Sequence, residues 1–273
     1  MNGFGFKRSD GTTPVVKNLI FINAILLIAS WVLATRFNYD LTEKLGLFYF
    51  DSPNFKPYQY ITHMFMHGGL THLFFNMFAL WMFGKVLESV WGSKRFLIYY
   101  MVTGLGAAAL HTLVNYIHYS QIHAAIMAFS NTPSPDLFAA IVNKHFSFFG
   151  QVDPAFFSNW SSHIKDPTFA QAATDQLNAL YTKLINIPTV GASGAVFGVL
   201  LAFGMLFPNT ELMLLFPPIP IKAKWAVIGY GALELYLGLT QPGSNIAHFA
   251  HLGGMLFGFI LIKYWNSKRT TFY

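Results

Sequence analysis

The amino-acid sequence predicts an all-α membrane protein with six transmembrane helices. The 273-residue chain is 54% hydrophobic and only 10% charged, whereas soluble domains typically carry about 25% charged residues. It also contains six apolar stretches close to the length of about 20 residues that a spanning helix needs. These stretches lie approximately at residues 17 to 35, 67 to 89, 95 to 117, 189 to 207, 224 to 240 and 246 to 264.

The basic residues predict how the helices are oriented. Lys and Arg near helix ends resist translocation, so they concentrate in cytoplasmic loops. With both termini in the cytoplasm, eleven of the 17 basic residues lie on the cytoplasmic side. These are Lys7, Arg8, Lys17, Lys85, Lys94, Arg95, Lys222, Lys224, Lys263, Lys268 and Arg269. The net charge of +6 therefore reflects topology, and we expect a lipid bilayer rather than nucleic acid as the partner. No removable signal peptide is expected, because residues 1–14 are polar.

The chain divides into five predicted segments. A cytoplasmic segment (1–16) precedes the first three helices (17–117), and an extracytoplasmic insertion (118–188) separates them from the last three (189–265) and a cytoplasmic tail (266–273). Within the insertion, Ser134-Pro135, Asp153-Pro154 and Asp166-Pro167 each predict a helix start, because a capping side chain precedes a proline. The helix after Asp166 has one apolar face, which favours packing on the bilayer or on the bundle.

The absence of cysteine excludes disulfides, thiolate catalysis and cysteine-based metal centres. The pairs His63/His67 and His248/His251 have ligand-like spacings. Neither forms an H-E-x-x-H motif, and no carboxylate beside them in sequence offers a general base. We therefore expect neither a metal nor a cofactor.

Ser193 is the first candidate for chemistry. It lies in Gly191-Ala192-Ser193-Gly194-Ala195, at the predicted outer end of an apolar helix. Free amides and the helix dipole at such an end stabilise developing negative charge. The ordinary alternative is that the small residues only pack helices and the serine caps one.

His251 is the second candidate. Gly254 and Gly258 follow it on the last helix, and Gly194 and Gly198 give the serine-bearing helix a matching smooth face. Close packing of these two faces brings His251 towards Ser193 at equal depth.

His72 and Asn76 lie four residues apart and so share one helical face. Their N–H groups are uncharged donors that suit an oxyanion hole, although polar groups in a membrane bundle also form ordinary interhelical hydrogen bonds. Three further polar residues near the outer mouth, Gln59, His63 and His67, are expected to line a wet cavity.

The patterns H-x-x-x-N at 72–76, G-A-S-G at 191–194 and H-x-x-G-x-x-x-G at 251–258 occur in that order. In this combination the chain resembles the rhomboid family of intramembrane serine proteases, over about three quarters of its length. The resemblance implies a six-helix bundle in which Ser193 is the nucleophile and His251 the base. It also implies that His72, Asn76 and the Ser193 amide form the oxyanion hole.

The resemblance further implies transmembrane proteins as substrates and a site open to the outer side of a bacterial cytoplasmic membrane. One departure is the loop after the first helix, where the family often has a Trp-Arg pair and this chain has no tryptophan between Thr35 and Leu80. Glu234 is a candidate to orient His251, with a structural hydrogen bond as the alternative. A catalytically silent relative that binds membrane proteins and a transporter remain the alternative functions. The sequence assigns neither a substrate nor an oligomeric state.

Overall fold

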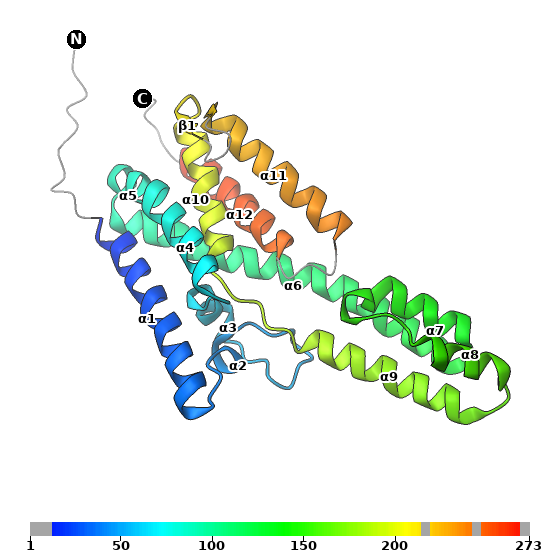
Figure 1. Ribbon diagram of the computed structural model, residues 1–273. Coiled ribbons are helices and arrows are strands. Elements are labelled where there is room, and N and C mark those ends of the chain that lie inside the picture. The colour runs from blue at the N-terminus through cyan, green and yellow to red at the C-terminus, as the bar shows by residue number, and fades with distance from the viewer. Residues whose placement is uncertain (1–12, 214–218, 242–246, 268–273) are drawn as a thin grey trace, which may run out of the picture.

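The computed structural model describes residues 13–213, 219–241 and 247–267, and these residues are mostly helical. Long helices form a bundle, and a helical arm projects from it (Figure 1). The elements in chain order are α1 (Pro14–Phe37), α2 (Thr42–Leu45), α3 (Gln59–Thr62), the 3-10 helix η1 (His63–Phe65), α4 (Leu70–Ala79), the π-helical turn η2 (Leu80–Gly84), α5 (Lys85–Trp91), α6 (Ser93–Asn131), α7 (Pro135–Ile141), the π-helical turn η3 (Val142–Phe146), the 3-10 helix η4 (Ser147–Phe149), α8 (Pro154–Ser162), α9 (Pro167–Ile185), α10 (Ser193–Leu206), β1 (Glu211–Met213), β2 (Pro220–Lys222), α11 (Ala223–Thr240) and α12 (His248–Ser267).

Each of the six apolar stretches contains helix, which confirms the all-α class. Within the described part of the chain, three helical segments are long and apolar enough to cross a membrane, namely Pro14–Phe37, Leu70–Trp91 and Ser93–Asn131. Helix α10 is apolar but has only 14 residues. The count of six spans therefore stays a prediction.

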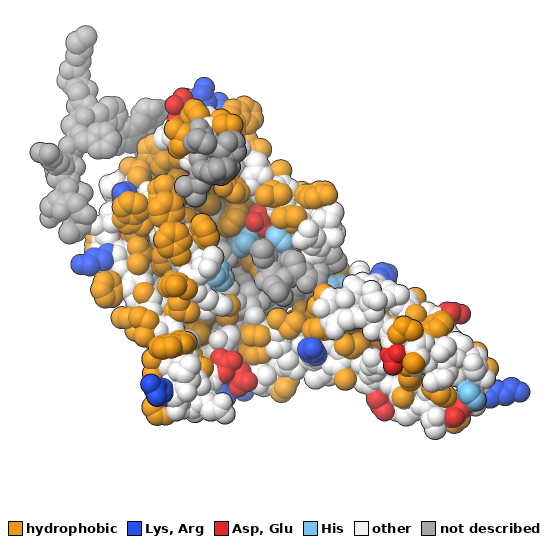
Figure 2. All heavy atoms as spheres, in the orientation of Figure 1, with side chains coloured by type: hydrophobic (Ala, Val, Ile, Leu, Met, Phe, Trp, Pro, Cys, Tyr) orange, Lys and Arg blue, Asp and Glu red, His pale blue; other side chains and the backbone are white. Residues whose placement is uncertain are grey.

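Apolar side chains cover much of the outside of the bundle. On α1, the side chains of Phe21, Ile28 and Trp31 are 61%, 62% and 69% exposed. Such a surface is unfavourable in water but suits lipid. Figure 2 shows hydrophobic side chains gathered over the α4 side of the bundle, with charged side chains mainly towards its ends and on the arm.

The bundle core lies around α10, which packs against α6, α11 and α12. Gly194 on α10 contacts Gly254 on α12 so closely that a methyl group on Gly254 would overlap the Gly194 carbonyl. Gly198 and Gly258 instead face Thr103 and Tyr99 of α6. The expected contact between α10 and α12 is therefore made by one glycine pair, and the second pair accommodates α6 at the same core.

Glu88 ties the start of α1 to the rest of the bundle. Its carboxylate is buried and accepts hydrogen bonds from the backbone amides of Val15 (3.0 Å) and Val16 (2.9 Å). It also accepts a 2.7 Å bond from the hydroxyl of Ser93 at the start of α6. Because the first amides of a helix have no partner within the helix, this carboxylate caps α1 and complements its dipole.

The arm consists of the far half of α6 together with α7, α8 and α9 (Figure 1). Helix α6 continues past residue 117 to Asn131, so the segment expected as an insertion begins inside a helix. The arm has its own apolar cluster around Phe129, Phe138, Trp160 and Leu177. All three predicted helix starts are confirmed, since Ser134, Asp153 and Asp166 accept bonds from amides of the helices they precede. The apolar face of α9 packs on α6.

The loop from 38 to 69 is organised around Gln59, which is fully buried. Its side-chain oxygen accepts a bond from the Lys56 amide (3.0 Å), and its nitrogen donates to the carbonyls of Asn54 (2.9 Å) and Lys44 (3.3 Å). The prediction that Gln59 lines a wet cavity is therefore wrong. The loop has backbone groups that need partners, and one buried amide supplies several of them.

Candidate active site

Ser193 is the first residue of α10, and the chain just before it is firmly held. Thr189 and Leu47 exchange two backbone hydrogen bonds of 2.8 and 2.9 Å, and the Gly191 amide donates to the His63 carbonyl (2.9 Å). His111 on α6 contacts the Thr189 hydroxyl at 3.0 Å. These contacts fix the approach to Ser193 from two directions, which positions its hydroxyl without the help of a ligand.

Ser193 and His251 meet inside the bundle. The Ser193 Oγ and His251 Nε2 atoms are 2.8 Å apart, although the residues are 58 positions apart in sequence. His251 is buried, with 8% of its surface exposed. Gly194, directly after Ser193, contacts Gly254, one turn after His251, and this close contact permits the approach. A hydroxyl and an imidazole at this distance can exchange a proton, as nucleophilic catalysis by serine requires.

Phe197 and Glu234 also contact His251. The Phe197 ring lies parallel to the imidazole, with centroids 4.2 Å apart and an interplanar angle of 6°. On the other edge, Glu234 Oε2 lies 2.9 Å from His251 Nδ1 and 2.6 Å from His248 Nδ1. Sequence reasoning left the role of Glu234 open and did not find Phe197. The signal for Phe197 was its position one helical turn after Ser193, on the same face.

One potential metal-ligand atom from each of Glu234, His248 and His251 lies within 4.8 Å of the others, a grouping that could hold a metal ion. The two distances from the Glu234 carboxylate to the imidazoles indicate hydrogen bonding or ion pairing rather than joint coordination of a metal ion. Two ligands on a tetrahedral zinc are about 3.3 Å apart, given metal–ligand distances near 2.0–2.1 Å. The contacts of Glu234 with the two imidazoles, at 2.6 and 2.9 Å, have hydrogen-bond or ion-pair lengths.

His72 lies beside Ser193, across Gly191. Gly191 has a φ of +132°, and a side chain on it would come within 2.8 Å of the His72 ring and 3.6 Å of Ser193 Oγ. The ring and the hydroxyl therefore border the same space, which only glycine leaves open. Asn76 is buried, and its side-chain nitrogen donates to the His72 carbonyl within the same helix (3.1 Å). A donor and an amide-bearing helix start thus lie around Ser193, as an oxyanion hole requires.

The two remaining histidines near the predicted mouth are also buried. His63 is 5% exposed, and its Nδ1 contacts the Gln59 carbonyl at 2.8 Å. Burial lowers the pKa of His63 to about 4. His67 is 6% exposed and packs edge-to-face against His72, with ring centroids 5.0 Å apart. The short loop 241–245 before His251, whose sequence fits either a cap over the site or an ordinary turn, lies outside the described residues except for Gln241.

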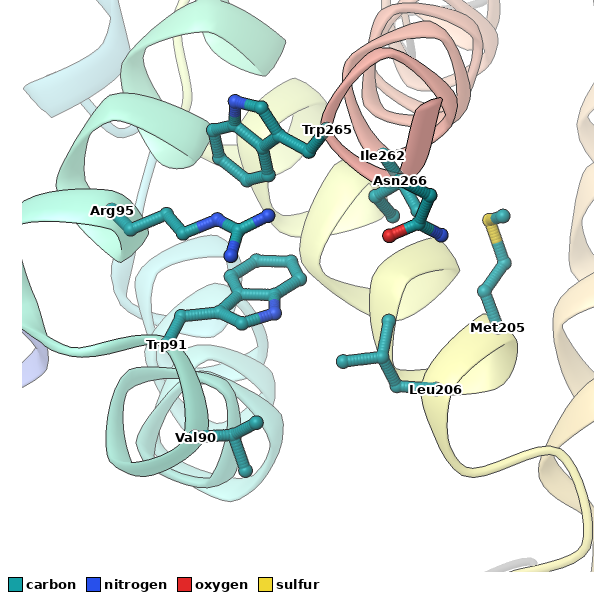
Figure 3. Close-up of a pocket in the computed structure, with 8 residues that line it drawn as sticks. All are labelled: Val90, Trp91, Arg95, Met205, Leu206, Ile262, Trp265 and Asn266. Carbon is teal, nitrogen blue, oxygen red and sulfur yellow. The ribbon is translucent and has the colours of Figure 1, made fainter. Parts of the chain in front are cut away.

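A separate pocket of about 280 Å³ lies at the opposite end of the bundle (Figure 3). Arg95 lies between the rings of Trp91 and Trp265 there, with its Cζ atom 4.1 Å from the Trp265 ring centroid and 5.8 Å from that of Trp91. Leu206, the last residue of α10, lines this pocket. Because Ser193 starts the same helix, roughly 20 Å of helix separates the pocket from the serine, so it is no part of the site.

The fold and the site define an all-α integral membrane protein with a serine–histidine pair inside its bundle. Residues 54–151 and 154–267 match the rhomboid domain, so the chain belongs to the rhomboid family. Over 204 residues it is 26% identical to Rhomboid protein 1, mitochondrial, of Saccharomyces cerevisiae, an alignment that covers 75% of this chain and 40% of the relative.

Two further relatives extend the comparison. The chain is 25% identical over 269 residues to RHOMBOID-like protein 12, mitochondrial, of Arabidopsis thaliana, covering 92% of this chain and 62% of that protein. It is 42% identical over 45 residues to Rhomboid protease GluP of Bacillus subtilis, covering 16% of this chain and 9% of GluP. The chain thus spans less than two thirds of the length of each of these relatives.

Proposed function

We propose that this protein is an intramembrane serine endopeptidase that hydrolyses peptide bonds in or near transmembrane segments of other membrane proteins. The observation that carries the proposal is the 2.8 Å contact between Ser193 Oγ and His251 Nε2 inside a rhomboid bundle. One relative of this chain, GluP of Bacillus subtilis, is named as a rhomboid protease. The reaction needs no metal or cofactor.

In the first half of the reaction, Ser193 Oγ attacks the carbonyl carbon while His251 Nε2 takes the hydroxyl proton. Negative charge develops on the carbonyl oxygen, and His72, Asn76 and the Ser193 amide stabilise it. His251 then returns the proton to the leaving amine as the C–N bond breaks. In the second half, water attacks the acyl-enzyme with His251 again as the base, and the serine is restored.

The backbone of a transmembrane substrate limits which proteins such a protease can cleave. A transmembrane helix hides its carbonyls in hydrogen bonds within the helix, so a substrate must unwind before Ser193 can attack. Substrates with helix-weakening residues near one membrane face meet this condition. We further propose that both termini are cytoplasmic and that the site opens to the opposite face. We propose the bacterial cytoplasmic membrane as its location, although relatives that align over most of this chain carry mitochondrial names.

The test is cleavage of a purified single-span substrate by the purified protein in detergent, with Ser193→Ala and His251→Ala in parallel. Each substitution should lower the cleavage rate by about 10³-fold or more. Ser130→Ala and His123→Ala, both on the arm, remove the same kinds of side chain away from the site and should leave the rate unchanged. A fluorophosphonate probe should label wild-type protein and not Ser193→Ala.

Cleavage that persists in both site variants would reject the serine–histidine pair. A folded wild-type protein that binds the substrate without cleaving it or reacting with the probe would instead identify a catalytically silent member of the family. Both outcomes are read from the same set of proteins, so no separate preparation is needed.

A further inference from the structure

Glu234 places one carboxylate oxygen between two imidazoles. Its Oε2 atom lies 2.6 Å from Nδ1 of His248 and 2.9 Å from Nδ1 of His251. All three residues are at least nine-tenths buried. Glu234 comes from α11 and the histidines from α12, so the cluster also joins two packed helices. The arrangement extends the Ser193–His251 pair by two further residues.

A buried carboxylate in this helix is costly. Glu234 is the one acidic residue in the sequence of α11, whose other side chains are mostly apolar. Removing a carboxylate from water costs several kcal/mol even after the surrounding protein relaxes, and a partner must offset that cost. An apolar residue would stabilise two helices more cheaply, and an ionisable group inside a membrane bundle marks a functional position.

The contact favours the tautomer that His251 needs. For Nε2 to accept the Ser193 proton, the proton of the neutral ring must be on Nδ1. Glu234 is the acceptor next to Nδ1. Once Nε2 is protonated the ring is a cation, and the carboxylate at 2.9 Å stabilises it. The oxygen lies out of line with the Nδ1–H bond at rest, so this contact is an ion-pair distance rather than a directed hydrogen bond. Catalytic contacts commonly align only when the substrate is bound.

His248 holds the carboxylate in place. Its Nδ1 forms a directed hydrogen bond of 2.6 Å with Glu234 Oε2, and its ring is nearly perpendicular to that of His251, at 89°. His72 on α4 and His111 on α6 also interact electrostatically with His251, and both are imidazoles. Among these described neighbours, the negative charge comes from Glu234.

We propose that Glu234 is a positioning residue for His251 and is itself held in place by His248, so that Ser193, His251, Glu234 and His248 form one connected set of side chains. The inference rests on the proposed function and adds to it a charge that the sequence pattern alone does not include. The proton still moves only between Ser193, His251 and the leaving amine. Glu234 stays ionised throughout and supplies orientation and charge.

The experiment measures kcat, KM and the pH dependence of kcat/KM for Glu234→Gln, which keeps the shape and removes the charge. The kcat value should fall by about 10²-fold or more, with KM nearly unchanged, because the lost interaction is strongest in the transition state. The acid limb of kcat/KM should move to lower pH, since the imidazole loses the anion that favours its protonated form. Glu211→Gln on β1 is the matched control and should change neither quantity.

A second pair of variants keeps the test sharp if Glu234→Gln folds poorly. His248→Ala should lower kcat by about tenfold, the value of one hydrogen bond to a charged group. His248→Asn should recover most of the loss, because its amide can donate from the same position. If the cluster were merely structural, these variants would lose thermal stability, but the acid limb of their kcat/KM profile would not move.

The outcomes separate this inference from the proposed function. Wild-type protein that shows no Ser193-dependent cleavage or labelling overturns both. Wild-type cleavage with a Glu234→Gln variant of equal kcat, or of reduced kcat with an unmoved acid limb, overturns the positioning role alone. A reduced kcat together with a shifted acid limb and recovery in His248→Asn supports it.

Discussion

The ring of Phe197 lies flat against the imidazole of His251, 4.2 Å away and tilted by only 6°. Phe197 and Ser193 are one turn apart on α10, so the same helix presents the hydroxyl to Nε2 and a platform to the ring face. With Glu234 at the Nδ1 edge, the imidazole of His251 is held at its face, at one edge and at its reacting nitrogen. His251 therefore has little rotational freedom before a substrate arrives.

Phe197→Leu should lower kcat by about two- to tenfold, since an aromatic stack is worth roughly 0.5–1.5 kcal/mol. Leucine keeps most of the packing and removes the flat platform. Phe197→Tyr keeps the ring and should retain wild-type kcat. The comparison is made by steady-state cleavage, and equal rates for the leucine and tyrosine variants would show that the stack does not orient His251.

His72→Ala should lower kcat by about 10²- to 10³-fold, the usual effect of removing one oxyanion donor. The ring borders the space beside Ser193, so its loss should leave Ser193 in place. Circular dichroism and thermal unfolding should accordingly match wild type. His118 lies on α6, and His118→Ala is the control for loss of an imidazole, so it should keep full activity. A His72→Ala enzyme with normal kcat would remove this residue from the site.

Gly254→Ala should destabilise the fold by more than about 2 kcal/mol, because overpacking against backbone forces two helices apart. The added methyl group would overlap the Gly194 carbonyl. The variant should also lose cleavage, because α12 carries His251. Gly229→Ala on α11 is the matched control, since no atom lies within 4 Å of its added methyl group. That control should be neutral or stabilised, as alanine favours helix. Thermal unfolding in detergent distinguishes them.

Glu88→Gln should destabilise the protein by about 1–2 kcal/mol, through weaker charge-assisted bonds to the start of α1. The amide retains one acceptor oxygen but presents N–H groups to the Val15 or Val16 amide. The lost stability should be local, so limited proteolysis near residue 14 should accelerate more than global unfolding. Unchanged proteolysis relative to Glu211→Gln would mean that α1 is held by packing alone.

Acid should destabilise the protein in part through His63. Its pKa is about 4 in the folded protein, because burial disfavours the charged ring, against about 6.5 in an unfolded chain. The unfolded state thus binds the proton more tightly. The stability that the neutral His63 contributes is therefore fully present above pH 6.5 and is lost as pH falls towards 4. The difference amounts to roughly 3 kcal/mol. His63→Asn can keep the bond to Gln59 and does not titrate, so its unfolding free energy should fall less steeply between pH 6.5 and 4. Equal slopes would contradict the assignment.

The Ser193–His251 contact could be anticipated from the sequence. Each residue lies beside a glycine face at the predicted outer end of an apolar helix, and the three motifs together resemble those of the rhomboid family. The partner glycines of the second pair, Gly198 and Gly258, could not be assigned, because two crossing helices touch closely at one point. Further along, the free faces accommodate a third helix, here α6 with Thr103 and Tyr99.

The contacts that sequence reasoning left undecided depend on geometry between distant elements. Glu234 is 17 positions before His251 and has no spacing pattern that links them, so its contact required the packing of α11 on α12. Helix α6 extends beyond the predicted span for another reason. Hydropathy predicts where a helix leaves the lipid, and the polar residues after 117 lower it. However, no proline or glycine lies between residue 117 and Pro133 to end the helix. The helix therefore extends beyond the apolar stretch.

Helix α6 runs without interruption from Ser93 to Asn131, so a continuous helix joins the arm to the bundle. A helix of that length measures roughly 58 Å. His111, which contacts Thr189 just ahead of Ser193, lies near its middle. An antibody fragment bound at the arm tip would thus be attached to the same helix that contacts the approach to Ser193, and it would serve as a fiducial for imaging a molecule otherwise surrounded by its detergent belt.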